Sequence, residues 1–373
     1  MVQAASVYIH IPFCRSKCGY CDFSSFASLD HLYKDYVDAL MEEIRGSPRL
    51  SAGTVYFGGG TPSLLPVEMT SDIMAEVTKR FLIQKEAEIT LEANPATVSA
   101  LDLERLKSIG INRLSIGVQS FNTGTLEMLG RDYKQQDAVE SIQAALKTGF
   151  TNLSVDVMTA IPGQTTASMI NDLKTAVEFQ PEHLSVYQLT LHENSPMQKE
   201  LGYNAHKMPG NDVQAELYET AIEFLGGYGY GHYEISNFAK PGKECRHNLA
   251  AWLGEEYLGL GSGAHSFLQK RRFANPNRPE DYISHIANGV SPRELTGKPK
   301  NELIEYLLMR LRLVDRDINF SEINDKFGID FRRLYRGPIE KLDRNNLLTV
   351  NNSGFKLTRR GLLFLNNILL EFI

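Results

Sequence analysis

Three of the chain's four cysteines lie within eight residues of one another, close to the start of the sequence. They are Cys14, Cys18 and Cys21, spaced as CxxxCxxC, and Cys245 is the fourth. Thiolates favour iron–sulphur clusters or zinc, and clusters are usually held by four cysteines. Three thiolates leave one iron of a four-iron cluster open to another ligand. The spacing therefore predicts a 4Fe-4S cluster that binds a small molecule.

A structural zinc site is the alternative interpretation of the same cysteines. Zinc takes four ligands, and His10 or Cys245 would supply the one that the three cysteines leave open. Cys245 also has a simpler interpretation, since a free cysteine often behaves as a small buried apolar residue. A disulphide is not expected in a reducing compartment.

Small and polar residues accompany the next segments that we expect to be strands. Gly59, Gly60 and Thr61 form a turn whose lack of side-chain bulk lets the backbone approach a ligand closely. Single polar groups end or lie within three later strands: Glu92, Gln119 and Asp156. Because the loops of a βα barrel gather at the carboxyl ends of its strands, we expect all of these residues in one mouth with the cysteines.

The elements that position these residues alternate between β-rich runs and segments of helical period, which is typical of βα units. The expected strands cover residues 7–11, 54–57, 89–92, 113–117, 153–161 and 183–191. Helices are expected at residues 32–44, 101–106 and 211–225, among others. Six units are too few for a complete eight-stranded barrel. The fold class is therefore α/β, with a partial, open (β/α)6 barrel.

A different pattern follows the barrel. Residues 241–299 contain several prolines among polar residues and are predicted to connect two domains, residues 1–240 and 300–373. Beyond them, helices are expected at residues 301–313, 320–326 and 331–344, with hairpin strands at residues 347–350 and 355–357. This order predicts a small winged-helix-like α+β domain. Its mixed charges favour packing against the barrel or a partner over DNA binding.

The bulk composition indicates the class of protein. The 373 residues are 42% hydrophobic with a formal charge of −6, which argues against broad binding to nucleic acid. No apolar run approaches the roughly 20 residues that cross a bilayer, and the N-terminus lacks a signal-like pattern. We expect a cytoplasmic protein, with the inner face of the membrane as an alternative, peripheral location.

Taken together, the motifs resemble those of the radical-SAM superfamily, and within it the anaerobic coproporphyrinogen III oxidase-like family. The resemblance covers residues 6–265 and extends more loosely to the C-terminus. The segments that carry it are YIHIPFC at residues 8–14, CGYCDF at 18–23, GGGTP at 58–62, SIGVQSF at 115–121, PGQT at 162–165 and YEISNF at 233–238.

The resemblance implies a 4Fe-4S cluster on the three cysteines and S-adenosylmethionine (SAM) on its open iron, cleaved after an electron arrives from a donor protein. Arg131 would pair with the SAM carboxylate and Tyr8 and Tyr20 would wall the site. The remaining contacts would come from Gly59, Gly60 and Thr61 to the SAM amine, and from Glu92, Gln119 and Asp156 to the adenosyl part.

Two branches of the family are distinguished by particular residues. The HemN-type dehydrogenases have a further cysteine two positions after the third, where this chain has Phe23. The segment HNLAAW at residues 247–252 resembles the HNxxYW haem signature of the HemW family of haem chaperones, except that Ala251 replaces tyrosine. Further departures from the family pattern are Tyr133 in place of histidine and His192 in place of glutamate.

The resemblance therefore implies a haem chaperone that passes haem to a haem protein, with a membrane-bound haem protein as one candidate acceptor and His247 in contact with the haem. For His247 a histidine hydrogen-bonded inside the fold is the alternative. An oxygen-independent coproporphyrinogen III oxidase, or another radical-SAM enzyme acting on a tetrapyrrole, is the alternative function. No catalytic residue is assigned, and whether the chain is an enzyme stays open.

Overall fold

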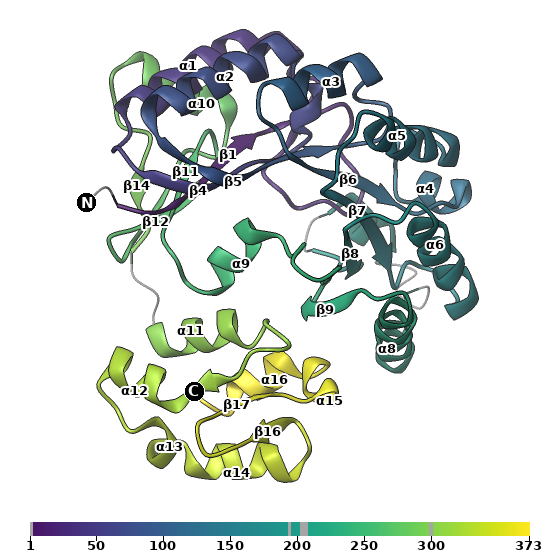
Figure 1. Cartoon of the computed structure of the whole chain (residues 1–373), viewed down its shortest axis with the longest axis vertical. Helices are drawn as coiled ribbons and strands as arrows, with labels where there is room; N and C mark the ends of the chain where they lie inside the picture. The colour runs from purple at the N-terminus through teal and green to yellow at the C-terminus, as the bar shows by residue number, and fades with distance from the viewer. Residues whose placement is uncertain (1–2, 193–194, 202–207, 298–300) are drawn as a thin grey trace.

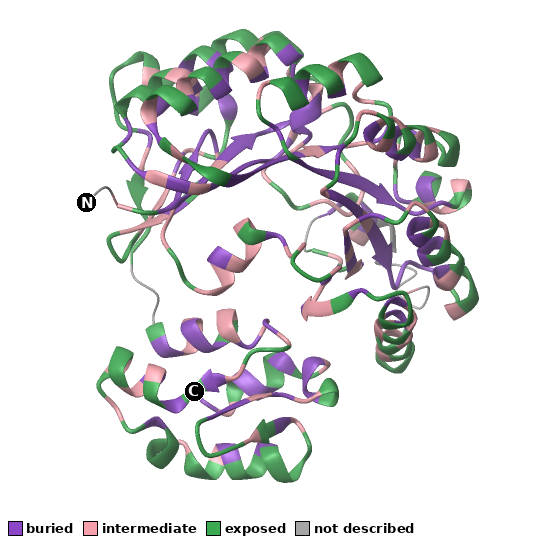
Figure 2. Cartoon of the chain, in the orientation of Figure 1, coloured by how far each residue is buried: buried purple, intermediate pink, exposed green. Residues whose placement is uncertain are grey.

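The computed structural model describes residues 3–192, 195–201, 208–297 and 301–373. A single curved sheet of 12 strands dominates the larger part of the chain, with most helices on its outer face (Figure 1). The C-terminal part forms a smaller body against the open side of that curve. The strands are largely buried, and the outward faces of the covering helices are exposed (Figure 2).

The six expected strands are present as parallel neighbours in chain order, which confirms the partial (β/α)6 barrel. Their bounds are β1 Ser6–Ile11, β4 Ser51–Gly59, β5 Leu82–Ala93, β6 Arg113–Gln119, β7 Leu153–Thr159 and β8 His183–Gln188. The crossover helices are α1 Tyr33–Gly46, α2 Val67–Arg80, α3 Ala100–Ser108, α4 Thr123–Met128, α5 Gln135–Lys147 and α6 Thr166–Glu178. After β8 come α7 Pro196–Leu201 and α8 Asn211–Gly227.

The local sequence explains why these elements form. Every residue of β6 is buried, as expected for a parallel strand covered on both faces. In α1 the buried residues Tyr36, Leu40 and Ile44 recur at helical spacing and face the sheet. A capping box begins α3, where Ser99 and Asp102 satisfy each other's backbone N–H groups.

Residues 241–299, predicted as a connection, contain regular structure that extends the sheet beyond β1. They form α9 Arg246–Trp252, β11 Tyr257–Leu260, β12 His265–Leu268, β13 Arg271–Ala274, α10 Pro279–Ala287 and β14 Glu294–Leu295. β11 pairs in parallel with β1, and the next three strands are antiparallel. Gln269 and Lys270 both adopt positive φ in the turn between β12 and β13. Glycine or asparagine usually occupies such positions, and neither does here, so the sequence carries no signal for this turn.

The C-terminal domain contains the expected hairpin and additional short elements. Its helices are α11 Glu302–Arg310, α12 Phe320–Phe327, α13 Phe331–Leu334, α14 Arg336–Arg344, α15 Arg359–Leu362 and α16 Leu365–Leu370. Its strands are β15 Ile318–Asn319, β16 Leu348–Val350 and β17 Gly354–Leu357. The single helix expected over residues 331–344 is wrong, because the chain breaks at Tyr335 between α13 and α14. The stacked rings of Phe331, Phe355 and Phe372 form the centre of this core.

An arginine links the two bodies through the edge of the sheet. The remaining edge strands are β9 Gly231–Glu234 and β10 Asn237–Ala239. Arg312 donates to the buried Glu234 at 3.0 and 3.1 Å, and its guanidinium lies 4.5 Å above the ring of Trp252 in α9. In Figure 1, α9 lies between the curved sheet and α11. None of the helices in the described part of the chain is long and apolar enough to cross a membrane.

Candidate functional site

The cysteine loop follows β1 and is tied back on itself. Two short strands, β2 Phe13–Cys14 and β3 Phe26–Ala27, pair at its base. Lys17 reaches across the loop and donates to the carbonyl oxygens of Phe23 at 2.6 Å and Ser25 at 3.0 Å. These bonds hold the loop in a compact form above the carboxyl ends of the barrel strands.

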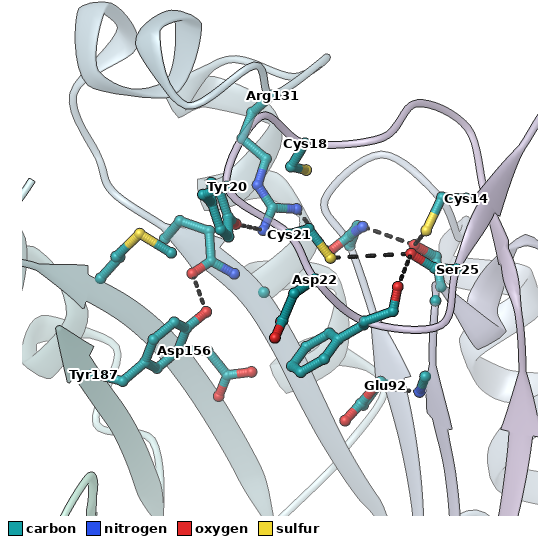
Figure 3. Close-up of a pocket in the computed structure, with 18 of the residues that line it drawn as sticks. Cys14, Cys18, Tyr20, Cys21, Asp22, Ser25, Glu92, Arg131, Asp156 and Tyr187 are labelled. Atoms are coloured by element: carbon teal, nitrogen blue, oxygen red, sulfur yellow. Dashed lines mark hydrogen bonds between the residues drawn. The ribbon is translucent and has the colours of Figure 1, made fainter. Parts of the chain in front are cut away.

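Cys14, Cys18 and Cys21 all line one pocket of about 330 Å³, which we call the cysteine pocket (Figure 3). Thr61 Oγ1 donates to Cys14 Sγ at 3.7 Å, and Cys21 Sγ lies 3.9 Å from Ser25 Oγ. Burial raises the pKa of Cys14 and Cys18, which favours their thiol forms until a metal replaces the proton. Three sulphurs facing one cavity suit a cluster with an open iron.

Neither residue considered as a fourth zinc ligand is available to these cysteines. His10 uses both ring nitrogens, with Nδ1 2.9 Å from Tyr8 Oη and Nε2 2.7 Å from the carbonyl oxygen of Ser24. Cys245 is fully buried next to α9, and its Sγ donates to Glu88 Oε1 at 3.6 Å. The structure therefore favours the cluster over the zinc alternative, and it supports the interpretation of Cys245 as a buried side chain.

The glycine turn after β4 fits closely against the end of β1. Gly59 has φ +112°, and a Cβ at this position would lie 2.6 Å from His10 Nδ1. A Cβ on Gly60 would lie 2.5 Å from the carbonyl oxygen of Phe13. Only glycine is tolerated at either position, so the turn leaves an uncovered backbone cradle beside the cysteines.

Glu92 stands at the end of β5 and closes the base of the cradle. It accepts hydrogen bonds from Tyr56 Oη at 2.7 Å and from the Gly59 N–H at 3.2 Å. Burial raises the pKa of Glu92 to about 7, and the nearby charge of Asp156 adds to that rise. Glu92 is therefore a carboxyl group whose charge changes near neutral pH.

Asp156 and Gln119 are two further polar residues that line the cysteine pocket. Ser115 Oγ donates to both carboxylate oxygens of Asp156 at 3.1 Å, and burial raises the pKa of that carboxyl. A shift in strand register separates Gln119 from the rest of β6, and its φ is +62°. This irregularity directs Gln119 to Tyr187, whose hydroxyl donates to Gln119 Oε1.

Arg131 projects into the cysteine pocket from the segment between α4 and α5. Its guanidinium donates to Tyr20 Oη and, at 3.4 Å, to Asn94 Oδ1, and it lies over the rings of Tyr20 and Tyr133 at 5.6 and 5.8 Å. Within the described residues its buried Nε has no hydrogen-bond partner, and no carboxylate pairs with it. A buried guanidinium without a counterion fits an anionic group of a ligand.

Tyr133, one of the departures from the family pattern, lies behind this arginine. Its hydroxyl donates to the carbonyl oxygens of Gly117 at 2.7 Å and Val118 at 3.0 Å. These bonds anchor the Tyr133 ring to the end of β6, where the ring packs against the guanidinium of Arg131.

Tyr8 and His247 line a second pocket, of about 500 Å³, beside the first. His247 Nδ1 lies 2.8 Å from Thr54 Oγ1, and its ring packs 4.9 Å from that of Tyr56. Burial lowers the pKa of His247 to about 4, so this histidine is neutral near pH 7. The two interpretations of His247 are compatible, because it is hydrogen-bonded inside the fold and also lines a cavity.

Several residues that line the cysteine pocket were not assigned from the sequence, among them Tyr187, Asp22 and His192. Tyr187 lies on β8, and Asp22 and His192 face each other with a 3.1 Å contact between Oδ2 and Nδ1. Asp22 directly follows the last cysteine, and His192 follows the last parallel strand. Position at a strand end, which identified Glu92 and Gln119, would also have identified Tyr187.

The residues present fit a cluster with bound SAM. Three cysteines line one cavity, a bare glycine cradle lies beside them, and the Arg131 guanidinium, which has no carboxylate partner among the described residues, lies next to Cys18 and Tyr20 (Figure 3). Thiolates are the ligands that iron–sulphur clusters require, and a guanidinium is suited to a carboxylate.

Comparison with known proteins agrees with this geometry. Residues 8–176 match the Radical SAM superfamily, and residues 298–364 match the HemN C-terminal domain. The fold is similar to that of coproporphyrinogen III oxidase (HemN) from Escherichia coli, with a TM-score of 0.86 and 23% identity, covering 100% of this chain and 90% of that one. The fold and the site define a radical-SAM protein with a HemN-type C-terminal domain.

Full-length relatives narrow the class to one family. The chain is 34% identical to the heme chaperone HemW of Escherichia coli, covering 99% of this chain and 98% of the relative. It is 33% identical to HemW of Bacillus subtilis, covering 99% of each, and 30% identical to HemW of Lactococcus lactis, covering 99% and 97%. The chain belongs to the HemW family.

Proposed function

We propose that this protein is a haem chaperone that binds a 4Fe-4S cluster, SAM and haem, and passes the haem to a haem protein. The observation that carries the first part is the cysteine pocket, where three thiols share one cavity with a guanidinium that has no carboxylate partner among the described residues. The relatives that are named heme chaperones, and that match over their full length, support the second part.

Each site residue has a task in this proposal. Cys14, Cys18 and Cys21 would hold the cluster, and Arg131 would pair with the SAM carboxylate. When bound, a cluster of this kind supplies the electron that breaks a carbon–sulphur bond of SAM. The glycine cradle would admit the SAM amine, while Gln119 and Asp156 offer polar groups to the adenosyl part.

Tyr20 and the contact between Asp22 and His192 have a further role. They lie at the rim of the cysteine pocket and would limit the access of water to the bound nucleotide. Tyr8 lines the neighbouring pocket. Its hydrogen bond to His10 would hold in place the end of β1, which leads into the cysteine loop.

The partners follow from the same proposal. An electron donor is required, and the haem acceptor would be a haem protein, which we place in the membrane. The chaperone would meet it as a peripheral protein from the cytoplasmic side.

Coproporphyrinogen oxidation is the second candidate, favoured by the full-length fold match to HemN. Phe23 argues against it, because this residue occupies the position of the further cysteine of that branch. In the structure Phe23 is 67% exposed and lines both pockets, so it is a surface group between them rather than a core residue.

Anaerobic reconstitution of the purified chain separates these functions. We expect iron with acid-labile sulphide, binding of SAM, a saturable haem titration, and no protoporphyrinogen from coproporphyrinogen with SAM and a reductant. Formation of protoporphyrinogen would replace the chaperone with the enzyme, and zinc without iron would refute both.

A further inference from the structure

A buried histidine at the start of β8 has no role in the site described so far. His183 is 1% exposed, so its imidazole lies inside the barrel. Burial lowers the pKa of His183 well below its ordinary value, and the charge of Arg113 adds to that fall. The ring is therefore neutral near pH 7, with one nitrogen that donates a proton and one that accepts. In the interior, each of these nitrogens needs a partner.

The register of the sheet places His183 beside Ser154 and close to Asp156. Ser154 of β7 is the register partner of His183, and Asp156 lies two residues further along the same strand. Because side chains alternate along a strand, Ser154 and Asp156 point to the same side. Ser154 Oγ donates to Asp156 Oδ1 at 3.0 Å and lies 2.8 Å from His183 Nδ1. One hydroxyl thus joins the histidine to a carboxyl group that lines the cysteine pocket.

Tyr233 of β9 contacts the other nitrogen of this imidazole. Its Oη lies 2.8 Å from His183 Nε2, and the two rings meet edge to face. The same Oη accepts a hydrogen bond from the backbone N–H of Cys245 at 3.2 Å. Tyr233, His183, Ser154 and Asp156 therefore form one continuous row of hydrogen-bonded side chains, which we call the His183 chain.

The donors and acceptors of the His183 chain can be paired in one direction. Tyr233 Oη accepts the Cys245 N–H, so its own proton is left to donate to His183 Nε2. A neutral imidazole that accepts at Nε2 carries its proton on Nδ1, which donates to Ser154 Oγ. The Ser154 hydroxyl is then free to donate to Asp156. Each donor polarises the next one towards the carboxyl group.

The His183 chain can act on a ligand only through Asp156. Neither of the two pockets described above is lined by Tyr233, His183 or Ser154, whereas Asp156 lines the cysteine pocket (Figure 3). Burial raises the pKa of Asp156, and the serine hydroxyls that donate to it oppose that rise. The chain therefore favours a charged carboxylate whose orientation is set from inside the barrel.

We propose that Tyr233, His183 and Ser154 are positioning residues that orient Asp156 to accept hydrogen bonds from the ribose hydroxyls of SAM. This inference rests on the proposed function, because it explains how the SAM site of that function selects its nucleotide. Ser154 occupies Asp156 from inside the barrel, and the side of the carboxylate that faces the cysteine pocket needs donors. Two neighbouring ribose hydroxyls supply them, and a nucleotide without them would leave that side unpaired.

Tyr233→Phe is the first test, because it removes one hydroxyl from the His183 chain and keeps the ring. Binding to the anaerobically reconstituted chain is measured with two probes, SAM and its 2′,3′-dideoxy analogue. The unaltered chain should bind SAM more tightly than the analogue. In Tyr233→Phe we expect the affinity for SAM to fall about three- to tenfold, while the affinity for the analogue stays unchanged.

Tyr230→Phe is the matched control for this variant. Tyr230 is also buried and donates its hydroxyl proton, to the carbonyl oxygen of Pro181 at 2.7 Å, but it does not contact the His183 chain. Its loss should leave the binding of both probes unchanged. Iron content and the unfolding temperature of each variant report any general damage to the barrel.

Two variants of His183 and a double variant test the direction of the chain. His183→Asn keeps an amide donor near the position of Nδ1, whereas His183→Ala removes both ring contacts. We expect the affinity for SAM to fall about tenfold or more in His183→Ala and less in His183→Asn. In an Asp156→Asn background, which lacks the carboxylate, Tyr233→Phe should cause no further loss, because the two residues act as one unit.

The outcomes separate the two proposals. If the unaltered chain binds no SAM, the proposed function fails, and the role of the His183 chain fails with it. If SAM binds, the role of the chain alone is overturned by any of three results: equal affinity of the unaltered chain for both probes, equal weakening of both probes or of neither in Tyr233→Phe, or additive effects in the Asp156→Asn background. Equal losses in His183→Asn and His183→Ala would contradict the assignment of Nδ1 as the donor.

Discussion

Replacing Arg131 by methionine tests the central physical claim about the cysteine pocket. Methionine keeps most of the length of the side chain and removes the guanidinium, whose Nε has no hydrogen-bond partner among the described residues. A hydrogen bond to a charged group contributes about 1.5–3 kcal/mol. The dissociation constant for SAM should therefore rise about 10- to 150-fold.

Equilibrium binding of SAM to the anaerobically reconstituted chain measures this change. Arg15→Met is the matched control, because Arg15 is half-exposed and pairs with Asp132, next to Arg131 in the sequence, at 3.6 Å. It removes the same charge from a half-exposed position outside the pocket and should leave SAM binding within about twofold, as exposed ion pairs contribute little. Arg131→Lys should fall between the two, because lysine keeps the charge but cannot reproduce the planar guanidinium.

Decarboxylated SAM distinguishes carboxylate binding from damage to the pocket. Arg131 also bonds to Tyr20, so its loss could loosen the cysteine loop. If the guanidinium acts on the carboxylate, Arg131→Met should weaken SAM and leave its decarboxylated analogue almost unaffected. Equal weakening of both ligands, or an unchanged affinity for SAM with full iron content, would refute the assignment.

Three further predictions concern the pH response, the cluster and the second core. Since burial raises the pKa of Glu92 from its ordinary value to about 7, the folded chain binds a proton more tightly than the unfolded chain between about pH 4.5 and 7. Its contribution to stability therefore falls as pH rises through that window, and Glu92→Gln should flatten this part of a urea-unfolding profile; an unaltered slope would contradict it. Cys14→Ser should lose the iron–sulphur absorbance, whereas Cys245→Ser should keep it, and the reverse pattern would exclude the proposed ligand set. Phe331→Ala should destabilise the C-terminal domain by about 3–5 kcal/mol in calorimetry, because Phe331 is fully buried between Phe355 and Phe372, and a loss below about 1 kcal/mol would be inconsistent with its packing.

The alternation of strands explains why part of the site could be predicted and part could not. Alternate residues of a strand point to opposite faces. In β1, the side chains of Val7, Ile9 and Ile11 belong to the hydrophobic core. Tyr8 and His10 point to the opposite face of the strand and line the second pocket, the one beside the cysteine pocket. The family resemblance predicted Tyr8 as a wall residue. Which of two neighbouring cavities Tyr8 reaches depends on the helix and strands packed beside it.

Short spacings along the chain were enough to predict the three cysteines that line one pocket, the parallel order of six strands and the polar residues at their ends. This was possible because these features depend on short spacings and on one rule, that successive parallel strands end at the same edge. Glu92, Gln119 and Asp156 meet the cysteines for this reason.

How residues 241–299 extend the sheet became clear only from the three-dimensional packing. β11 pairs with β1 across about 250 residues of chain, and a strand of only four residues carries a weak local pattern. The packing of α9, β12 and α11 likewise brings Ala251, His265 and Met309 to the wall of one pocket. Contacts between segments so far apart are set by packing energy, which no local spacing encodes.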